Sequence, residues 1–261
     1  GNVYPTRESI LKAIADVRAE KLEAFVDNVK NEPIISTLPK KGKITKEKEN
    51  TTFGYKELQL SNGARVILKK TDYKKDEVIL KANAVGGTSE YDSKDFANIK
   101  LFNDVVEASG LGNFTSTELQ KALAGKIAGM SLSMSNTRVN IGGSSTPKDV
   151  ETMFQLLYLT FTKLNKDQEA YDNLMKQYEL YLKNMSLSPD AAFSDSVSVT
   201  MNCHNPRFAT ITENDLKQVN YDRILEMAAR ATSNAAAFTF FIIGNYDEAT
   251  IRPLICKYIA S

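Results

Sequence analysis

An Asn-Gly pair at residues 62 and 63 separates two apolar-rich runs. Leu58 and Leu60 precede the pair, and residues 65–68 follow it. Both central residues of a type I′ turn need a positive φ, which Asn and Gly adopt at little cost. The pair therefore predicts a β-hairpin with a type I′ turn, so we expect the chain to contain antiparallel strands.

Strand and helix patterns alternate after the hairpin. Strands are predicted at 77–87, as two short strands within 129–145, and at 237–245. Helices are predicted at 97–114 up to a glycine turn, from 115 or 116 to about 125, and at 146–164, 167–185, 189–201, 213–233 and 247–261. The helix at 146–164 has a clear start, with Thr146 at the N-cap and Pro147 at the first helical position. This order favours an α+β fold, in which helices pack on one face of an antiparallel or mixed sheet.

The first 54 residues have a different pattern. Thr6 can cap a helix, and apolar residues follow it at helical spacing: Ile10, Leu11, Ile14, Val17 and Leu22. We expect one long helix over about 6–30. Residues 33–54 combine two prolines, a lysine-rich run and glycines, which predicts an extended linker. The expected division is a connector at 1–54 and an α+β domain at 55–261.

The composition argues against several classes of partner. The chain has 33 Lys and Arg against 32 Asp and Glu, and its net charge of +1 gives no case for nucleic acid or an anionic membrane. No apolar run reaches the roughly 18 to 20 residues that a membrane span needs. The first residues lack the basic start and apolar core of a signal peptide. Two cysteines, Cys203 and Cys256, do not make a disulfide framework.

Four stretches carry a family resemblance: LSNGARVILKKT (60–71), VILKANAVGGTSEYD (78–92), SGLGNF (109–114) and FTFFIIGNYDEATIRPLICKYIAS (238–261). In this order they resemble the M16 zinc metallopeptidases, the pitrilysin or insulysin-like family, and above all its long bacterial members. The resemblance covers about residues 55–261. It implies the M16 peptidase fold, also called LuxS-like metallohydrolase, in a parent protein of four similar domains. Two bowl-like halves of that parent would enclose a peptide chamber.

The first domain of that family carries the motif HxxEH on a helix. Histidines four residues apart lie on one helix face and hold zinc, and the glutamate activates water. If Gly110 takes the place of the glycine after the motif, the positions of the two histidines and the glutamate fall on Leu101, Val105 and Asp104. If Gly86-Gly87 is the anchor, the motif falls on residues 99–103. Neither register supplies a histidine, so we predict no zinc site, no cofactor and no catalytic residue in this chain.

Asp104 could be a remnant of the acidic catalytic position, although a solvent-facing helix residue is the simpler interpretation. The apolar face of the same helix is expected to pack on the sheet as core: Ile99, Phe102, Val105 and Val106. By its resemblance the chain is then a degenerate domain. The connector before it and the segment at 109–126 place it as the third domain, the first of the C-terminal half.

Three other groups of residues could form sites. Cys203, His204 and Arg207 stand close together in the sequence, but adjacent loop residues rarely converge on one ion, so a structural loop is preferred. The run 142–145 before Pro147 could offer backbone N–H groups to an anion, although a strand-to-helix turn is preferred. The tyrosines at 171, 178 and 181 are expected to pack with hydrated hydroxyls.

These predictions lead to two hypotheses of function. The first is a non-catalytic domain of an M16 zinc metallopeptidase that helps to enclose peptide substrate, while proteolysis and zinc belong to the N-terminal half of the parent. Its partners would be the other domains of the same polypeptide and the peptide. The alternative is a stand-alone inactive M16-like scaffold or interaction module. By resemblance alone, the parent would be located in the bacterial periplasm or cell envelope.

Overall fold

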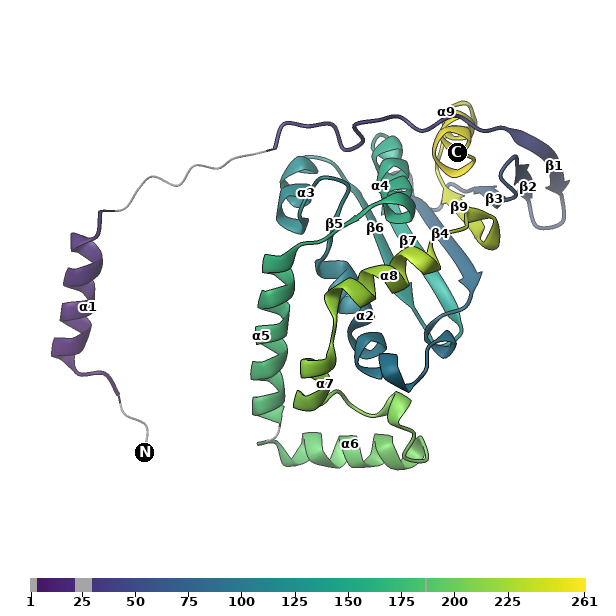
Figure 1. Ribbon diagram of the computed structural model, residues 1–261. Helices are drawn as coiled ribbons and strands as arrows, with labels where there is room; N and C mark the ends of the chain where they lie inside the picture. Colours follow the sequence, from purple (N-terminus) through teal and green to yellow (C-terminus); the bar gives the residue numbers. More distant parts are fainter. Residues whose placement is uncertain (1–3, 22–29, 186) are drawn as a thin grey trace. The chain divides into compact units, whose positions relative to one another are not determined.

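Figure 1 shows the computed structural model, which describes residues 4–21, 30–185 and 187–261. The chain divides into two compact units, Gly1–Lys30 and Asn31–Ser261. The first unit contains helix α1 (Arg7–Ala19), and the Thr6 side chain accepts the Ser9 N–H at 3.2 Å, which confirms the predicted cap. The second unit contains the sheet and the other described helices.

Helix α1 is shorter than predicted. It ends at Ala19, because Glu20 has an extended backbone with ψ of 130°. The prediction of a helix to about residue 30 is therefore wrong at Glu20, and its remainder at 22–29 lies outside the described residues. None of the 13 residues of α1 is buried, and a helix of that length has little stability in water without packing.

A seven-stranded mixed sheet forms the centre of the second unit, in the order β1-β2-β3-β9-β4-β7-β6. Its strands are β1 (Ile44–Asn50), β2 (Tyr55–Leu60), β3 (Arg65–Lys70), β4 (Val78–Val85), β6 (Ala128–Met134), β7 (Arg138–Ser145) and β9 (Thr239–Gly244). β3 and β9 pair in parallel, and the other neighbours pair antiparallel. β5 (Gly110–Leu111) and β8 (Leu164–Asn165) form a separate two-stranded sheet. The predicted antiparallel or mixed sheet is confirmed.

Strand β1 occupies part of the predicted linker. It pairs antiparallel with β2, with Asn50 opposite Tyr55, and Glu47 binds Arg252 at 2.8 Å. The prediction of an extended linker through residue 54 is therefore wrong for 44–50, and the compact unit begins at Asn31. The sequence ITKEKEN did not predict a strand because its lysines and glutamates alternate without apolar residues between them. On an edge strand such charges can stay exposed, where they also hinder pairing with other chains.

The β2–β3 hairpin is confirmed, but its turn is not of type I′. Gly63 has a φ of 88°, whereas Asn62 is not at positive φ. The Gly63 N–H donates to the Leu60 carbonyl at 3.0 Å, so residues 60–63 form the turn. The Asn62 side chain donates to the Ile259 carbonyl at 2.7 Å. Asn62 therefore holds the C-terminal segment against the hairpin instead of adopting a left-handed conformation.

Some of the described helices lie against one face of the sheet, and the others pack on those helices or extend beyond the sheet (Figure 1). The described helices of the second unit are α2 (Phe96–Ala108), α3 (Ser116–Ala122), α4 (Val150–Thr162), α5 (Gln168–Met185), α6 (Pro189–Met201), α7 (Glu213–Gln218), α8 (Tyr221–Ala231) and α9 (Glu248–Leu254). α2 and α4 lie against β6, and α8 lies against α2. Alternate residues of β4 are buried beneath these helices, which confirms the predicted layer arrangement. None of the described helices is long and apolar enough to cross a membrane.

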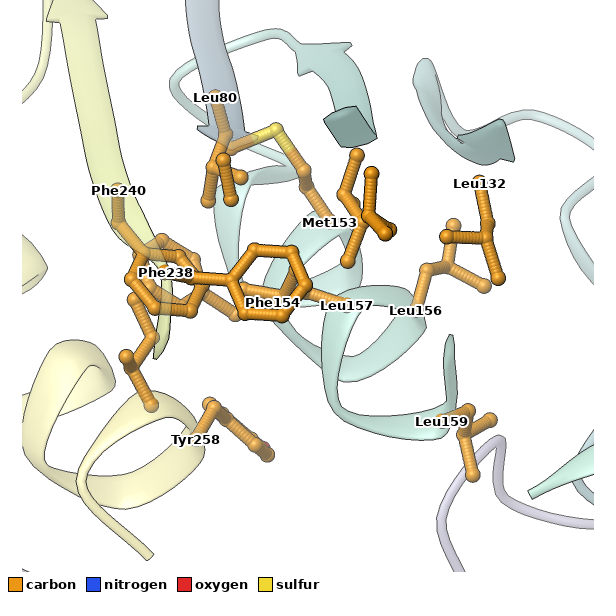
Figure 2. Close-up of a cluster of buried hydrophobic side chains, with 14 of the residues drawn as sticks. Leu80, Leu132, Met153, Phe154, Leu156, Leu157, Leu159, Phe238, Phe240 and Tyr258 are labelled. Atoms are coloured by element: carbon orange, nitrogen blue, oxygen red, sulfur yellow. The ribbon is translucent and has the colours of Figure 1, made fainter. Parts of the chain in front are cut away.

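Part of the core lies between the sheet and helix α4. Figure 2 shows Phe154 and Leu157 of α4 gathered with Leu80 of β4 and Phe240 of β9. All four are at most 1% exposed. Burial of large apolar side chains from the sheet and a helix is the main source of stability in such a layered unit.

Two predicted helix boundaries are wrong. Helix α4 begins at Val150, because Thr146 closes a turn in which the Asp149 N–H donates to its carbonyl at 3.1 Å. The Asp149 carboxylate also accepts the Ile127 N–H at 3.0 Å, so this turn is fastened to the start of β6. The predicted helix at 213–233 is divided into α7 and α8, because Asn220 caps a new helix by accepting the Arg223 N–H at 2.9 Å. A π-helical turn at Ile255–Ile259 follows α9.

Candidate functional site

Helix α2 is where the family resemblance places the zinc motif. Its apolar side chains form part of the core: Leu101, Phe102, Val105 and Val106 are each at most 5% exposed. Ile99 is half-buried and packs against the same cluster. The predicted packing of this face is therefore confirmed, and Leu101 joins it.

The positions aligned with HxxEH do not fit a zinc ion. Leu101 and Val105, which stand at the histidine positions, are 1% and 0% exposed and carry only carbon atoms in their side chains. The alternative register offers Asn103 as its last residue and again no imidazole. Among the described residues, no three His, Cys, Asp or Glu side chains are grouped so that they could hold a metal ion. Zinc of this family needs histidine and carboxylate donors in a converging set, and α2 does not provide one.

Asp104 binds a tyrosine. Its carboxylate accepts a hydrogen bond from the Tyr178 hydroxyl of α5, and Asp104 itself is half-buried. Burial, together with this hydrogen bond, raises the pKa of Tyr178 above its usual value. The interpretation of Asp104 as a solvent-facing residue is therefore wrong, and so is that of a hydrated Tyr178 hydroxyl. Both groups join α2 to α5.

Two more polar side chains of α2 bind neighbouring elements. Asn103 accepts the Met134 N–H at 2.8 Å and donates to the Met134 carbonyl at 3.3 Å, so it closes the end of β6. Lys100 binds Asp215 of α7 at 3.0 Å, and both side chains are largely buried. Burial opposes ionisation of Asp215, but the hydrogen bonds from Lys100 and Thr212 lower its pKa. These bonds join α2 to the sheet through β6 and to the helical layer through α7.

The N-terminal end of α2 is held by a buried network. Arg223 of α8 donates two hydrogen bonds to Asp95, at 2.7 and 3.1 Å. These bonds hold the pKa of Asp95 below its usual value, although burial opposes the shift. Asn98 donates to Asp95 at 3.0 Å and accepts the Asn220 N–H at 2.8 Å. Asn98, Lys100, Asn103 and Asp104 of α2 thus each bind a residue outside the helix, as expected of a helix that holds the fold together.

The structure separates Arg207 from its two neighbours in the sequence. Its guanidinium donates to the carbonyls of Thr88 and Tyr91, both at 2.6 Å, and lies 4.9 Å from the Phe96 ring centre. Cys203 and His204 are exposed, with φ of 53° and 54° in the left-handed region. Arg207 therefore fixes the segment that leads into α2, and the three residues do not converge on one site.

The other two candidate groups are also structural. Residues 142–145 belong to β7, where Gly143 pairs with Leu80 on one side and Met130 on the other. A Cβ on Gly143 would lie 2.2 Å from the Gly129 carbonyl oxygen, so glycine permits the close strand approach. The run is therefore neither an anion-binding loop nor a turn. Tyr171 stacks on Tyr221 with ring centres 4.5 Å apart.

Sequence reasoning missed the residues that fix α2 because their partners are distant in the chain. Lys100 and Asp215 are 115 positions apart, and Asp95 and Arg223 are 128 apart. Local periodicity carries no signal for such pairs. No local pattern distinguishes this helix from one whose polar face meets solvent, because both have an apolar face and a polar face.

Comparison with known proteins comes from the sequence and from the fold. No protein-family model matches the sequence. It is 25% identical over 254 residues to the "Zinc protease PQQL-like" of Arabidopsis thaliana, covering 96% of this chain and 24% of that protein. It is 26% identical over 253 residues to the "Probable zinc protease PqqL" of Escherichia coli, covering 97% of this chain and 27% of that protein. The chain thus spans about a quarter of the length of these relatives.

Solved structures show the same fold. The crystal structure of the periplasmic protease PqqL from Escherichia coli superposes with a TM-score of 0.76 over 98% of this chain and 28% of that one, at 24% identity. The crystal structure of the first half of the same protease superposes with a TM-score of 0.62 over 80% of this chain and 46% of that one, at 10% identity. Sequence and fold together make this chain a homologue of one part of the M16-family zinc proteases named PqqL.

Proposed function

We propose that this chain is a non-catalytic domain of a longer M16 zinc metallopeptidase, in which it helps to enclose the polypeptide substrate. The observation that carries the proposal is helix α2. Its positions at the zinc motif are occupied by buried leucine and valine, and its polar side chains bind β6, α5, α7 and Asn220, the N-cap residue of α8. A domain built in this way keeps the fold and lacks the donors for metal chemistry.

The comparisons support a position in the second half of the parent. The fit to the whole Escherichia coli protease is better than the fit to its first half, in TM-score, identity and coverage of this chain. We infer that a better-matching region outside the first half accounts for that difference. This supports the proposal that residues 55–261, which resemble an M16 domain, are the third domain of the parent. The zinc ion and the cleavage reaction then belong to the first half of the parent, in the bacterial periplasm or cell envelope.

The test compares the parent polypeptide with the 261-residue chain. We expect the purified parent to contain one zinc ion and to cleave unfolded polypeptide, and the 261-residue chain to do neither. Zinc content is measured by elemental analysis and cleavage by a fluorogenic peptide, with and without chelator. Stoichiometric zinc in the 261-residue chain, with cleavage lost on chelation, would overturn the proposal.

A variant of α2 provides the matched control. Asp104→Asn removes the carboxylate but keeps an oxygen that can accept the Tyr178 hydrogen bond. In the parent we expect it to leave zinc content and kcat unchanged. A large loss of zinc content or of kcat would mean that Asp104 takes part in zinc binding or in catalysis.

The alternative function is a stand-alone inactive scaffold or interaction module. It requires a natural gene product without an upstream HxxEH domain. The reading frame of the gene distinguishes the two, and a natural product confined to this domain would favour the scaffold.

A further inference from the structure

Helix α6 and the end of α5 form a surface with exposed apolar side chains. Helix α6 has 13 residues and none is buried. Phe193, Val197 and Met201 follow one another at four-residue spacing and are 71%, 40% and 80% exposed. Residues four apart lie on one face of a helix, so they form an apolar stripe. Exposed apolar stripes of this kind mark interaction surfaces on soluble proteins.

A cavity of about 470 Å³ lies beside the stripe. Tyr181 and Met185 of α5, Ser194 and Ser198 of α6, and Thr210 contribute to its lining. Ser194 and Ser198 each follow a stripe residue by one position, so the cavity and the stripe occupy adjoining faces of α6. We call the two together the α5–α6 surface.

Asp195 is the one charged residue among the described residues that line this cavity. Its Oδ1 atom is buried and has no hydrogen-bond partner among the described residues. A buried carboxylate oxygen without a donor is unfavourable, and such atoms are nearly always paired in native proteins. A Lys ammonium or an Arg guanidinium is the group that best complements the Asp195 carboxylate in the cavity lining.

We infer that the α5–α6 surface is the docking site for another domain of the parent polypeptide, which places a Lys or Arg side chain beside Asp195 and apolar side chains over the stripe. The inference rests on the proposed function, because it requires a longer parent. The relatives are about four times as long as this chain, so most of the polypeptide that could cover the surface lies outside it. A tethered domain also docks at high effective concentration.

A second copy of this chain fits the surface poorly. Helix α6 carries Asp190 and Asp195 and no basic residue. Symmetric pairing through α6 would bring these acids toward their equivalents, and like charges in an interface are unfavourable. The charge pattern therefore favours a partner with a basic group.

Hydrogen exchange tests the inference in the parent polypeptide. We expect the amides of α6 to exchange at least about ten times more slowly in the parent than in the 261-residue chain. A desolvated charged pair at Asp195 would give protection of this size. Asp195→Lys in the parent should return α6 to the exchange rate of the isolated chain, and Asp195→Asn should do so in part. Asp190→Lys is the matched control on an exposed turn of the same helix outside the cavity, and it should keep the protection. Circular dichroism of each variant in the 261-residue chain shows whether it folds.

Three results would overturn the inference. The first is equally fast exchange of α6 in the parent and in the isolated chain. The second is protection that appears in the isolated chain together with a dimer in light scattering, which would assign the surface to a second copy. The third is protection of the parent only after addition of a lysine-containing peptide, which would assign it to a client polypeptide. A parent that contains zinc and cleaves peptide, but leaves α6 unprotected, would reject this inference and keep the proposed function.

Discussion

Helices α2 and α6 have the same length, 13 residues each, and opposite environments. α2 buries six residues, and its polar side chains bind β6, α5, α7 and the N-cap residue of α8. α6 buries none and exposes its largest apolar side chains. The comparison shows that apolar residues at helical spacing indicate a partner, but do not tell whether that partner lies within the same chain. For α2 the partner is the sheet, and for α6 we place it in the rest of the parent.

The largest expected effect comes from installing the motif histidines in α2. Leu101→His with Val105→His should lower the free energy of unfolding by about 4 kcal/mol or more, because two imidazoles replace close-packed aliphatic side chains in a dry core. Denaturant unfolding with and without zinc measures it. The same pair in α6, Phe193→His with Val197→His, should change stability little. Stoichiometric zinc binding by the α2 variant without loss of stability would contradict our account of this helix.

Truncating one phenylalanine in each helix sharpens the comparison. Phe102→Ala should cost about 3 to 5 kcal/mol, because Phe102 is fully buried and its removal leaves a cavity. Phe193→Ala should stay within about 0.5 kcal/mol, because that ring is exposed in this chain. Urea unfolding of the 261-residue chain measures both. Similar losses for the two variants would mean that α6 has a partner in this chain after all.

The stabilisation by the ion pair of the buried Asp95 with the partly exposed Arg223 should depend on pH. Asp95→Asn should cost about 1 to 3 kcal/mol at neutral pH, because Arg223 loses its ionised partner. The folded pKa of Asp95 is lowered, so its contribution is full above the unfolded pKa of about 3.9 and is lost as pH falls through the folded pKa. Unfolding of both proteins from pH 7 down to pH 2 should therefore show a difference that shrinks with acid.

Asp222→Asn is the control for that measurement. Its pair with Lys166 lies at the surface, with 71% of the Asp222 side chain exposed, so we expect little change in stability. If the difference in unfolding free energy between wild type and Asp95→Asn stays constant down to the lowest pH, the ion pair is not its cause.

The smallest expected effect concerns the bond between α2 and α5. Tyr178→Phe should cost about 0.5 to 1.5 kcal/mol, the net value of one hydrogen bond. Because burial raises the folded pKa of Tyr178, its stabilising contribution should be complete below the unfolded pKa of about 10 and fall as pH rises further. Tyr181→Phe is the control, since Tyr181 is 55% exposed. Tyr246 also has a raised pKa, so tyrosine absorbance titration should show several late-ionising groups, of which Tyr178→Phe removes one.

Local signals predicted most element types. The cap at Thr6, the helix start at residue 115 or 116, the Asn-Gly hairpin and the bounds of α6 follow from residues within one or two turns of one another. Strand β1 was missed because its charged residues hide a pairing that only β2 supplies. The break at Asn220 was missed because a cap inside an amphipathic run changes no periodicity. The turn at Asn62 was assigned to the wrong type because the C-terminal segment competes for its side chain.

The sequence by itself determined the order of strands and helices and the poverty of metal ligands, because one histidine in 261 residues cannot supply the HxxEH pair in any fold. Only the tertiary structure decided how the polar residues of α2 are used and whether the apolar stripe of α6 is covered. Both depend on contacts between residues far apart in the chain. Periodicity describes the face that a helix presents, and packing decides what meets that face.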